Sequence, residues 1–155
     1  MRVLIVEDEA PKREHLQEFL AETLPQAERY AALSVRSAIA AIRDLKPDLV
    51  LLDMSLPTFD VLPNESGGRP QGFGGIEVLR YMDRYKVKAK TIVVTAYEAF
   101  FSEDRKGMQL GELAETLASK HPQNYLGLVY YNSVYGDWRQ ELREHIQSLG
   151  GDVGQ

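Results

Sequence analysis

The chain alternates between short apolar runs and longer segments in which apolar residues recur every three or four positions. Unbroken apolar runs occupy residues 3–6, 49–52 and 91–94. A run without polar alternation is typical of a strand that is covered on both faces. Residues 29–35 are a weaker strand candidate, and residues 125–131 are expected to form the last strand. The pattern therefore predicts five strands.

The segments between and after these runs have helical periodicity, with Ser37 and Asp137 as expected N-caps of the second and the last helix. The predicted buried stripes are Leu16, Phe19, Leu20 and Leu24; Ile39, Ile42 and Leu45; Ile76, Leu79 and Met82; Leu110, Leu113 and Leu117; and Trp138, Leu142, Ile146 and Leu149. Five strand-then-helix units in succession predict an α/β fold, a doubly wound parallel sheet in three layers with right-handed crossovers.

The chain length and the positions of glycine and proline predict one domain over residues 1–150, with a flexible tail at 151–155. The 155 residues suffice for a single hydrophobic core. Residues 58–74 are rich in proline and glycine and are expected to form a loop insertion. No internal repeat or low-complexity tract is present.

Composition narrows the classes of function. The chain has no cysteine, which excludes disulfides and zinc–thiolate sites and makes a cytoplasmic location the expectation. The formal net charge of −5 argues against a nucleic-acid partner, since such binding needs clustered lysine and arginine. No apolar stretch approaches the length of a membrane span, and no signal-peptide pattern opens the chain.

Polar groups follow three of the predicted strands directly. Glu7 and Asp8 follow the first strand, Asp53 follows the third, and Thr95 follows the fourth. In an open parallel sheet, ligands bind beyond the carboxyl ends of the strands, so these groups are expected at one edge. Carboxylates and waters are the ligands that Mg²⁺ prefers. An aspartate in this place can also accept a phosphoryl group.

Four segments in order, VLIVEDE, PDLVLLDMSLP, GGIEVLRYM and TIVVTAY, resemble the receiver domain of two-component response regulators. The resemblance runs from residue 1 to about residue 97. It implies a flavodoxin-like receiver fold with strand order 2-1-3-4-5. It further implies Asp53 as phosphoacceptor, Thr95 as switching hydroxyl, and Mg²⁺ bound by Glu7, Asp8, Asp53 and the backbone carbonyl of Ser55.

The same resemblance implies a function in phosphorelay signalling. The phosphoryl donor would be a histidine kinase or a phosphotransfer protein, and the chain would be a stand-alone receiver that switches binding to a downstream protein. It would not be an enzyme beyond self-catalysed phosphotransfer and slow dephosphorylation. A homodimer through the last strand and helices is a further expectation, because aromatic residues gather there.

Two departures from the family pattern imply an atypical receiver. The lysine that the family carries after its fifth strand is missing, and Tyr130 or Tyr131 stands in its place. The nearest basic residues in the sequence are Arg105, Lys106 and Lys120. The loop after Asp53 is also longer than usual in the family. The alternative interpretation is therefore a pseudo-receiver that acts as an interaction scaffold without phosphorylation.

Other interpretations of these residues have less support. A phosphatase of the haloacid dehalogenase type needs a second aspartate two residues after the first, where this chain has Ser55. A flavodoxin-like cofactor binder needs a hydroxyl-rich phosphate loop after the first strand, where this chain is acidic. His15, His121 and His145 lack metal-ligand spacing and are expected at the surface.

Overall fold

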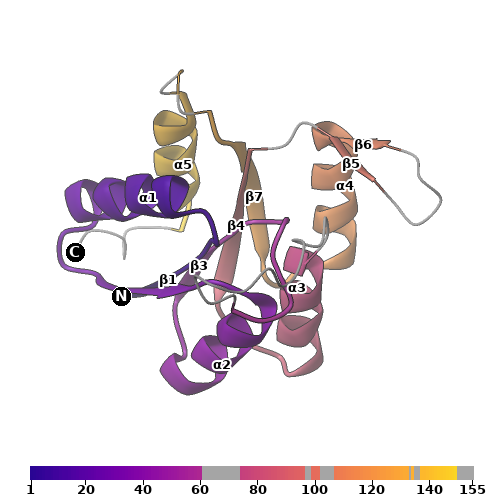
Figure 1. Ribbon diagram of the computed structural model, residues 1–155, viewed down its shortest axis with the longest axis horizontal. Helices are drawn as coiled ribbons and strands as arrows, with labels where there is room; N and C mark the ends of the chain where they lie inside the picture. The colour runs from indigo at the N-terminus through magenta and orange to yellow at the C-terminus, as the bar shows by residue number, and fades with distance from the viewer. Residues whose placement is uncertain (61–73, 97–98, 102–106, 133, 135–136, 150–155) are drawn as a thin grey trace.

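The computed structural model describes residues 1–60, 74–96, 99–101, 107–132, 134 and 137–149. The main sheet has five parallel strands in the order β2-β1-β3-β4-β7, which is the predicted 2-1-3-4-5 order (Figure 1). Its strands are β1 (Arg2–Val6), β2 (Glu28–Ala32), β3 (Leu49–Leu52), β4 (Lys90–Thr95) and β7 (Tyr125–Tyr130). The helices are α1 (Ala10–Thr23), α2 (Val35–Leu45), α3 (Gly74–Arg84), α4 (Leu110–Lys120) and α5 (Asp137–Gln147).

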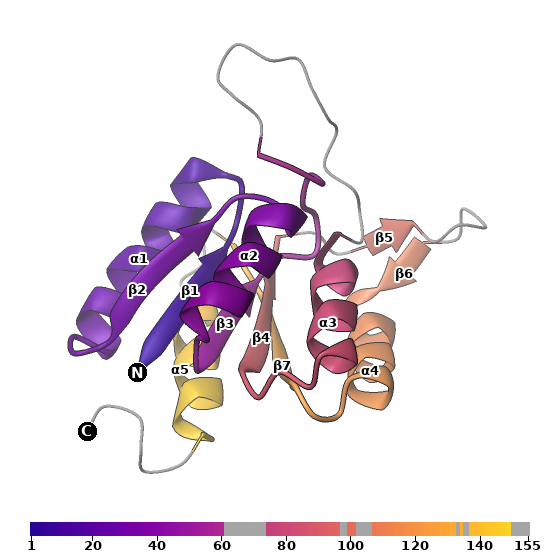
Figure 2. The same ribbon diagram turned by 90° about the horizontal axis from the view of Figure 1, so that it is seen from below.

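Helices cover both faces of this sheet, as Figures 1 and 2 show. Helices α1 and α5 pack on one face, and α2, α3 and α4 pack on the other. Strand β1 feeds both layers, because Val3 and Ile5 belong to the first core and Leu4 and Val6 to the second. All four side chains are at most 1% exposed, so the unbroken apolar runs do mark strands that are buried on both faces.

Several predicted boundaries were wrong. The second strand ends at Ala32, because the chain turns there into α2. Ser34, rather than Ser37, is the N-cap of α2. The Ser34 hydroxyl accepts from the Ser37 backbone N–H at 3.1 Å, and the Ser37 hydroxyl accepts from the Ser34 N–H at 3.0 Å. This reciprocal capping box uses both serines, and the sequence did not distinguish their roles.

The segment between β4 and α4 contains a short antiparallel pair that was not predicted, β5 (Ala99–Phe101) and β6 (Gly107–Gln109). Of the predicted 58–74 insertion, residues 61–73 lie outside the described residues, and Gly74 already belongs to α3. The predicted tail at 151–155 also lies outside them. Among the described residues, no helix is long and apolar enough to cross a membrane.

Two glycines at the start of α3 let this helix press against the segment that follows β3. A Cβ on Gly75 would lie 2.5 Å from the Asp53 carbonyl oxygen, and one on Gly74 would lie 2.7 Å from the Leu56 carbonyl oxygen. The Gly75 N–H donates to the Met54 carbonyl at 2.9 Å. Only glycine permits this approach of backbone to backbone. Helix α3 thereby fixes the turn that carries Asp53.

Candidate functional site

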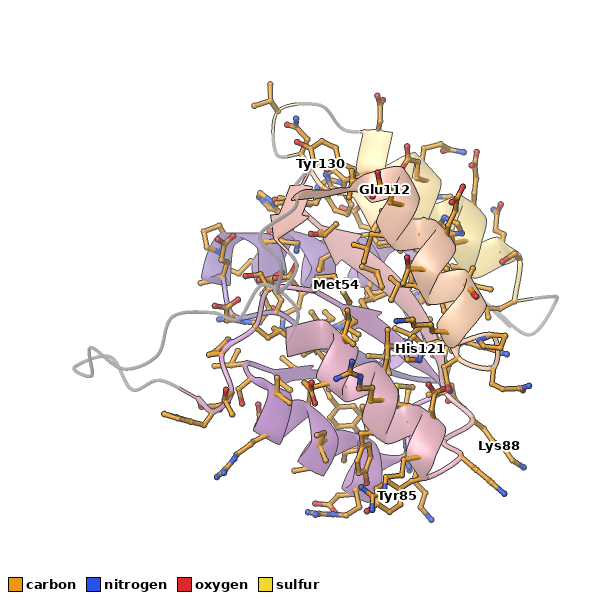
Figure 3. The ribbon with its side chains drawn as sticks, turned by 90° about the vertical axis from the view of Figure 1, so that its right-hand side faces the viewer. Met54, Tyr85, Lys88, Glu112, His121 and Tyr130 are labelled. Atoms are coloured by element: carbon orange, nitrogen blue, oxygen red, sulfur yellow. The ribbon has the colours of Figure 1, made fainter. Side chains whose placement is uncertain are left out.

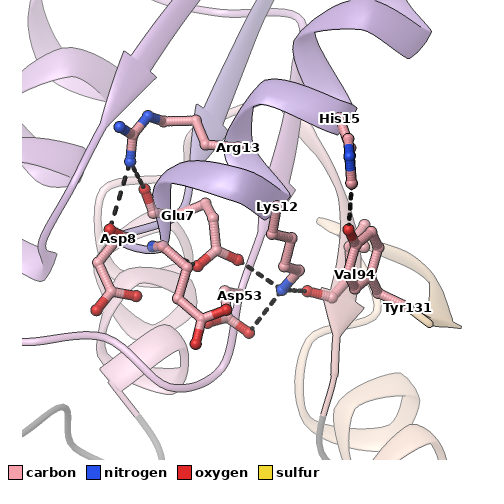
Figure 4. A network of polar contacts seen from close by, with 9 residues as sticks. Glu7, Asp8, Lys12, Arg13, His15, Asp53, Val94 and Tyr131 are labelled. Atoms are coloured by element: carbon pink, nitrogen blue, oxygen red, sulfur yellow. Dashed lines mark hydrogen bonds and ion pairs between the residues drawn. The ribbon is translucent and has the colours of Figure 1, made fainter. Parts of the chain in front are cut away.

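The backbone of the main sheet brings three carboxylates to its carboxyl edge. Hydrogen bonding continues one residue beyond the strands, because the Glu7 N–H donates to the Ala32 carbonyl and the Asp53 N–H to the Val6 carbonyl, each at 3.0 Å. Oxygen atoms of Glu7, Asp8 and Asp53 consequently lie within 4.8 Å of one another. The three side chains come from two strand ends that are far apart in the sequence (Figure 4).

Two of these carboxyl groups are deeply buried, Glu7 at 1% and Asp53 at 5% exposure, whereas Asp8 is half-buried. Burial, with the neighbouring charge of Asp53, raises the pKa of Glu7 to about 7. Burial also raises the pKa of Asp53 to about 6, although the Lys12 ammonium opposes this shift. Clustered acids in a site of low exposure favour the neutral form unless a cation joins them.

A cation does join them, and the sequence analysis missed it. The Lys12 ammonium, in the first turn of α1, lies 2.5 Å from Glu7 Oε1 and 3.2 Å from Asp53 Oδ1. It also donates a hydrogen bond of 2.7 Å to the Val94 carbonyl oxygen. Burial alone would lower the pKa of Lys12, but Asp53 and Glu7 raise it overall. Lys12 is therefore a buried, charged partner of the candidate phosphoacceptor.

The basic residues named from the sequence do not supply this cation. Arg105 and Lys106 lie outside the described residues. Lys120 ends α4 and lines a groove together with Lys86 and Lys88. This groove lies at the start of β4, at the opposite end of the strand from the acidic cluster. Lys12 had a recognisable signal: helical side chains tilt toward the N-terminus, so a long side chain directly after Pro11 points back at the acidic residues.

Thr95 and Ser55 are close to the acidic cluster along the chain. Thr95 ends β4 and is fully buried, and its carbonyl accepts a hydrogen bond of 2.8 Å from the Tyr131 N–H. It directly follows Val94, which holds Lys12. Ser55 is half-buried, two residues after Asp53.

Tyr131, directly after β7, faces the layer of α1 and α5. Tyr131 is buried in the core between α1 and α5, next to Trp138, with ring centroids 5.2 Å apart. The Tyr131 ring lies 5.7 Å from Lys12 Nζ, and its hydroxyl is hydrogen-bonded to His15 Nδ1 at 2.5 Å. Trp138 therefore belongs to the core, and Tyr135 lies outside the described residues.

The cluster has the donor set of a Mg²⁺ site. Among the described residues, Glu7 Oε1 and Asp53 Oδ1 are the buried side-chain oxygens that lack a hydrogen bond of good geometry, although both contact Lys12. Buried carboxylate oxygens with spare acceptor capacity fit a hard divalent cation. Asp8, which forms no ion pair with Lys12 among the described contacts, adds a more accessible oxygen.

Comparisons with known proteins bear on the family and the fold of this chain. Residues 3–114 match the family model described as response regulator receiver domain. An uncharacterized protein of Sinorhizobium fredii, y4jR, is 30% identical over 96% of this chain and 99% of its own length. The Detocs response regulatory protein DtcB of Enterobacter cloacae is 26% identical over 96% of this chain and its full length.

Solved structures share the fold. The response regulator TrrA of Thermotoga maritima, solved in complex with Mg²⁺ and a beryllium fluoride, superposes with a TM-score of 0.59 at 22% identity, covering 93% of this chain and 97% of that one. A LuxR-family response regulator of Staphylococcus aureus superposes with a TM-score of 0.66 at 18% identity, covering 96% and 97%.

Proposed function

We propose that this chain, which belongs to the response regulator receiver domain family, accepts a phosphoryl group on Asp53 in two-component signalling. The donor is a phosphohistidine of a histidine kinase or of a phosphotransfer protein. The observation that carries the proposal is the convergence of Glu7, Asp8 and Asp53 within 4.8 Å, with Asp53 almost fully buried at the end of β3.

The transfer conserves atoms and charge in a simple way. An oxygen of the Asp53 carboxylate attacks the phosphorus of the phosphohistidine. The new P–O bond forms as the P–N bond breaks, and the departing imidazole keeps the electron pair and takes up a proton from solvent. Water later attacks the acyl phosphate and releases inorganic phosphate. We propose no other reaction for this chain.

Mg²⁺ is the proposed cofactor, held by Glu7, Asp8, Asp53 and the Ser55 backbone carbonyl. Bound at these oxygens, it would neutralise charge on the transferring phosphoryl group. The chain's own groups then have separate tasks. The β1 and β3 ends hold the carboxylates in register, and the glycines of α3 fix the turn after Asp53.

The output is a change in protein–protein binding. Phosphorylation adds a compact negative group beside the end of β4, where we propose that the Thr95 hydroxyl follows the phosphoryl oxygens. Strands β4 and β7 are joined at this end by the hydrogen bond from Tyr131 to Thr95. A shift of Thr95 would therefore reach the face made by α4, β7 and α5, where a partner protein or a second copy of the chain would bind.

Intact mass after incubation with Mg²⁺ and acetyl phosphate tests this proposal. We expect one added phosphoryl group on the native chain and none on Asp53→Asn. Asp44→Asn is the matched control, because Asp44 is an exposed carboxylate whose described partner is Arg43. An Asp53→Asn variant that is still phosphorylated, or a native chain that accepts no phosphoryl group from this donor or from a histidine kinase, contradicts the proposal.

One observation favours a second candidate, the phosphorylation-independent scaffold. Lys12 already places a positive charge between Glu7 and Asp53, so it could occupy the role of the metal permanently. Calorimetric titration with Mg²⁺ separates the two functions. Binding to the native chain that is lost in Asp53→Asn supports the receiver, and an absence of binding supports the scaffold.

A further inference from the structure

We infer that Lys12, supplied by the first turn of α1, is the cation that contacts the phosphoryl oxygens on Asp53. This inference rests on the proposed function. It assigns to α1 the task of supplying the cation beside the phosphoryl group, because the end of β7 has no lysine. Residues 125–132, which run from β7 into the segment after it, contain no lysine or arginine. Within the described part of the chain, Asp53 has one ion-pair partner, Lys12.

The contacts of Lys12 place its charge over the ends of three strands. Its ammonium touches Glu7 after β1, Asp53 after β3 and the Val94 carbonyl of β4 (Figure 4). The ammonium therefore connects the phosphoacceptor to the end of β4, where Thr95 is the next residue after Val94. The ammonium donates one hydrogen bond, to the Val94 carbonyl, and contacts Glu7 and Asp53 as ion pairs, so its charge is held in place before any phosphoryl group arrives.

Tyr131 shows why the cation comes from α1 rather than from β7. This residue stands near the place of the missing lysine, and its side chain turns into the core of the α1 and α5 layer. Its ring lies 5.7 Å from Lys12 Nζ and its hydroxyl is bound to His15, one turn along α1. The end of β7 thus contributes an aromatic face behind the ammonium instead of a second cation.

Phosphorylation of Asp53 increases the negative charge that faces the Lys12 ammonium. Asp53 carries one negative charge as a carboxylate, and a phosphoryl group carries roughly −1.5 to −2. Lys12 stays protonated throughout and exchanges the Asp53 carboxylate oxygen for a phosphoryl oxygen. No covalent bond to Lys12 forms or breaks. Asp8, which lies outside its ion pairs, remains available for Mg²⁺.

The experiment compares Lys12→Met with Lys88→Met, which makes the same change in charge at an exposed lysine before β4. Beryllofluoride, a stable mimic of the phosphoryl group, is titrated in saturating Mg²⁺, and Mg²⁺ alone is titrated by calorimetry. Lys12→Met is expected to bind beryllofluoride about 10- to 100-fold more weakly, because a charge-assisted contact is lost. Its Mg²⁺ affinity should equal or exceed that of the native chain, and Lys88→Met should match the native chain in both titrations.

Lys12→Arg guards against loss of folding, because it keeps the charge. A planar guanidinium cannot reproduce the one hydrogen bond and two ion pairs of the Lys12 ammonium, so Lys12→Arg should weaken beryllofluoride binding by several-fold. Native affinity for beryllofluoride in Lys12→Met, or in Lys12→Arg if only that variant folds, overturns the inference and leaves the proposed function intact. A native chain that binds neither Mg²⁺ nor beryllofluoride, while Lys12→Met gains Mg²⁺ binding, means that Lys12 blocks the metal site and overturns both.

Discussion

The two edges of the main sheet handle buried polar groups in opposite ways. At the carboxyl edge, Glu7, Lys12 and Asp53 form a buried charged cluster in which two carboxylate oxygens accept no hydrogen bond of good geometry. At the amino edge, Asn124 is equally buried, but its amide donates to the carbonyls of Val87 and Ala89 at 2.6 and 2.9 Å. The His121 Nδ1 is hydrogen-bonded to the Asp83 carboxylate beside it.

The lysines of the two edges differ in their exposure to solvent. Lys86, Lys88, Lys90 and Lys120 line an open groove of about 750 Å³ at the amino edge, where solvent can screen them. Figure 3 shows Lys88 and His121 toward this end and Tyr130 toward the other. Lys12, at the carboxyl edge, is 3% exposed. Its charge acts through a medium of low polarity, where an ion pair is much stronger than in water.

This difference is the one we expect between a structural cluster and the functional cluster proposed at the carboxyl edge. Buried polar groups in a structural role are usually satisfied by hydrogen bonds, as Asn124 is. Buried carboxylates with spare acceptor capacity are costly to keep, and they persist where a ligand completes them. The His121 imidazole was expected at the surface, and its place in the satisfied cluster corrects that expectation.

Lys12→Met should produce the largest change in stability, and only without metal. Removing the ammonium leaves Glu7 and Asp53 buried without a partner, which typically destabilises a protein by about 3–5 kcal/mol. Urea unfolding in a chelating buffer and in Mg²⁺ would measure this, with recovery expected in Mg²⁺. Equal destabilisation in both buffers would mean that the metal does not reach these carboxylates.

Asn124→Ala should destabilise the amino edge by about 2–3 kcal/mol, since two carbonyl groups, of part-buried Val87 and buried Ala89, lose a donor. Unlike the effect of Lys12→Met, this loss should be the same with and without Mg²⁺, and Mg²⁺ affinity should not change. Urea unfolding and calorimetry check both parts. Weaker Mg²⁺ binding in Asn124→Ala would show that the two edges are coupled and would remove the contrast between them.

Asp53→Asn should stabilise the metal-free protein by about 1–2 kcal/mol at pH 8, because burial raises the pKa of Asp53 to about 6 and so disfavours its ionised form. A carboxyl group whose pKa is raised in the folded state destabilises that state as the pH rises through the folded pKa. The gain should therefore shrink below pH 6 and vanish near pH 4. Thermal unfolding across this range, in chelating buffer, measures it; a gain that does not vary with pH excludes Asp53 as its source.

Glu28→Gln should have the smallest effect. Glu28 pairs with Arg2 at 3.2 Å, but both side chains are more than half exposed. Exposed pairs contribute little because solvent and salt screen them. No measurable shift in the unfolding midpoint is expected, and a clear shift would mean that exposed charge also matters to this fold.

Much of the fold follows from the order of residues along the chain. The apolar runs at 3–6, 49–52 and 91–94 became β1, β3 and β4, because a strand that is covered on both faces leaves no room for polar alternation. The end of β2 and the cap of α2 were harder, since Ser34 and Ser37 have the same cap chemistry and only the observed backbone distinguishes them. The β5–β6 pair was missed because three-residue strands are too short for periodicity to register.

The sequence by itself determined that Glu7, Asp8, Asp53 and Thr95 end strands of a parallel sheet, and parallel strands bring such ends to one edge. Only the tertiary structure decided which cation meets them. A long flexible side chain can reach several places, and the choice of Lys12 depended on how α1 packs over β1 and where the Val94 carbonyl lies. The positions of strands along the chain are set by local patterns, whereas a contact between side chains 41 residues apart, as with Lys12 and Asp53, is set by the packing of whole elements.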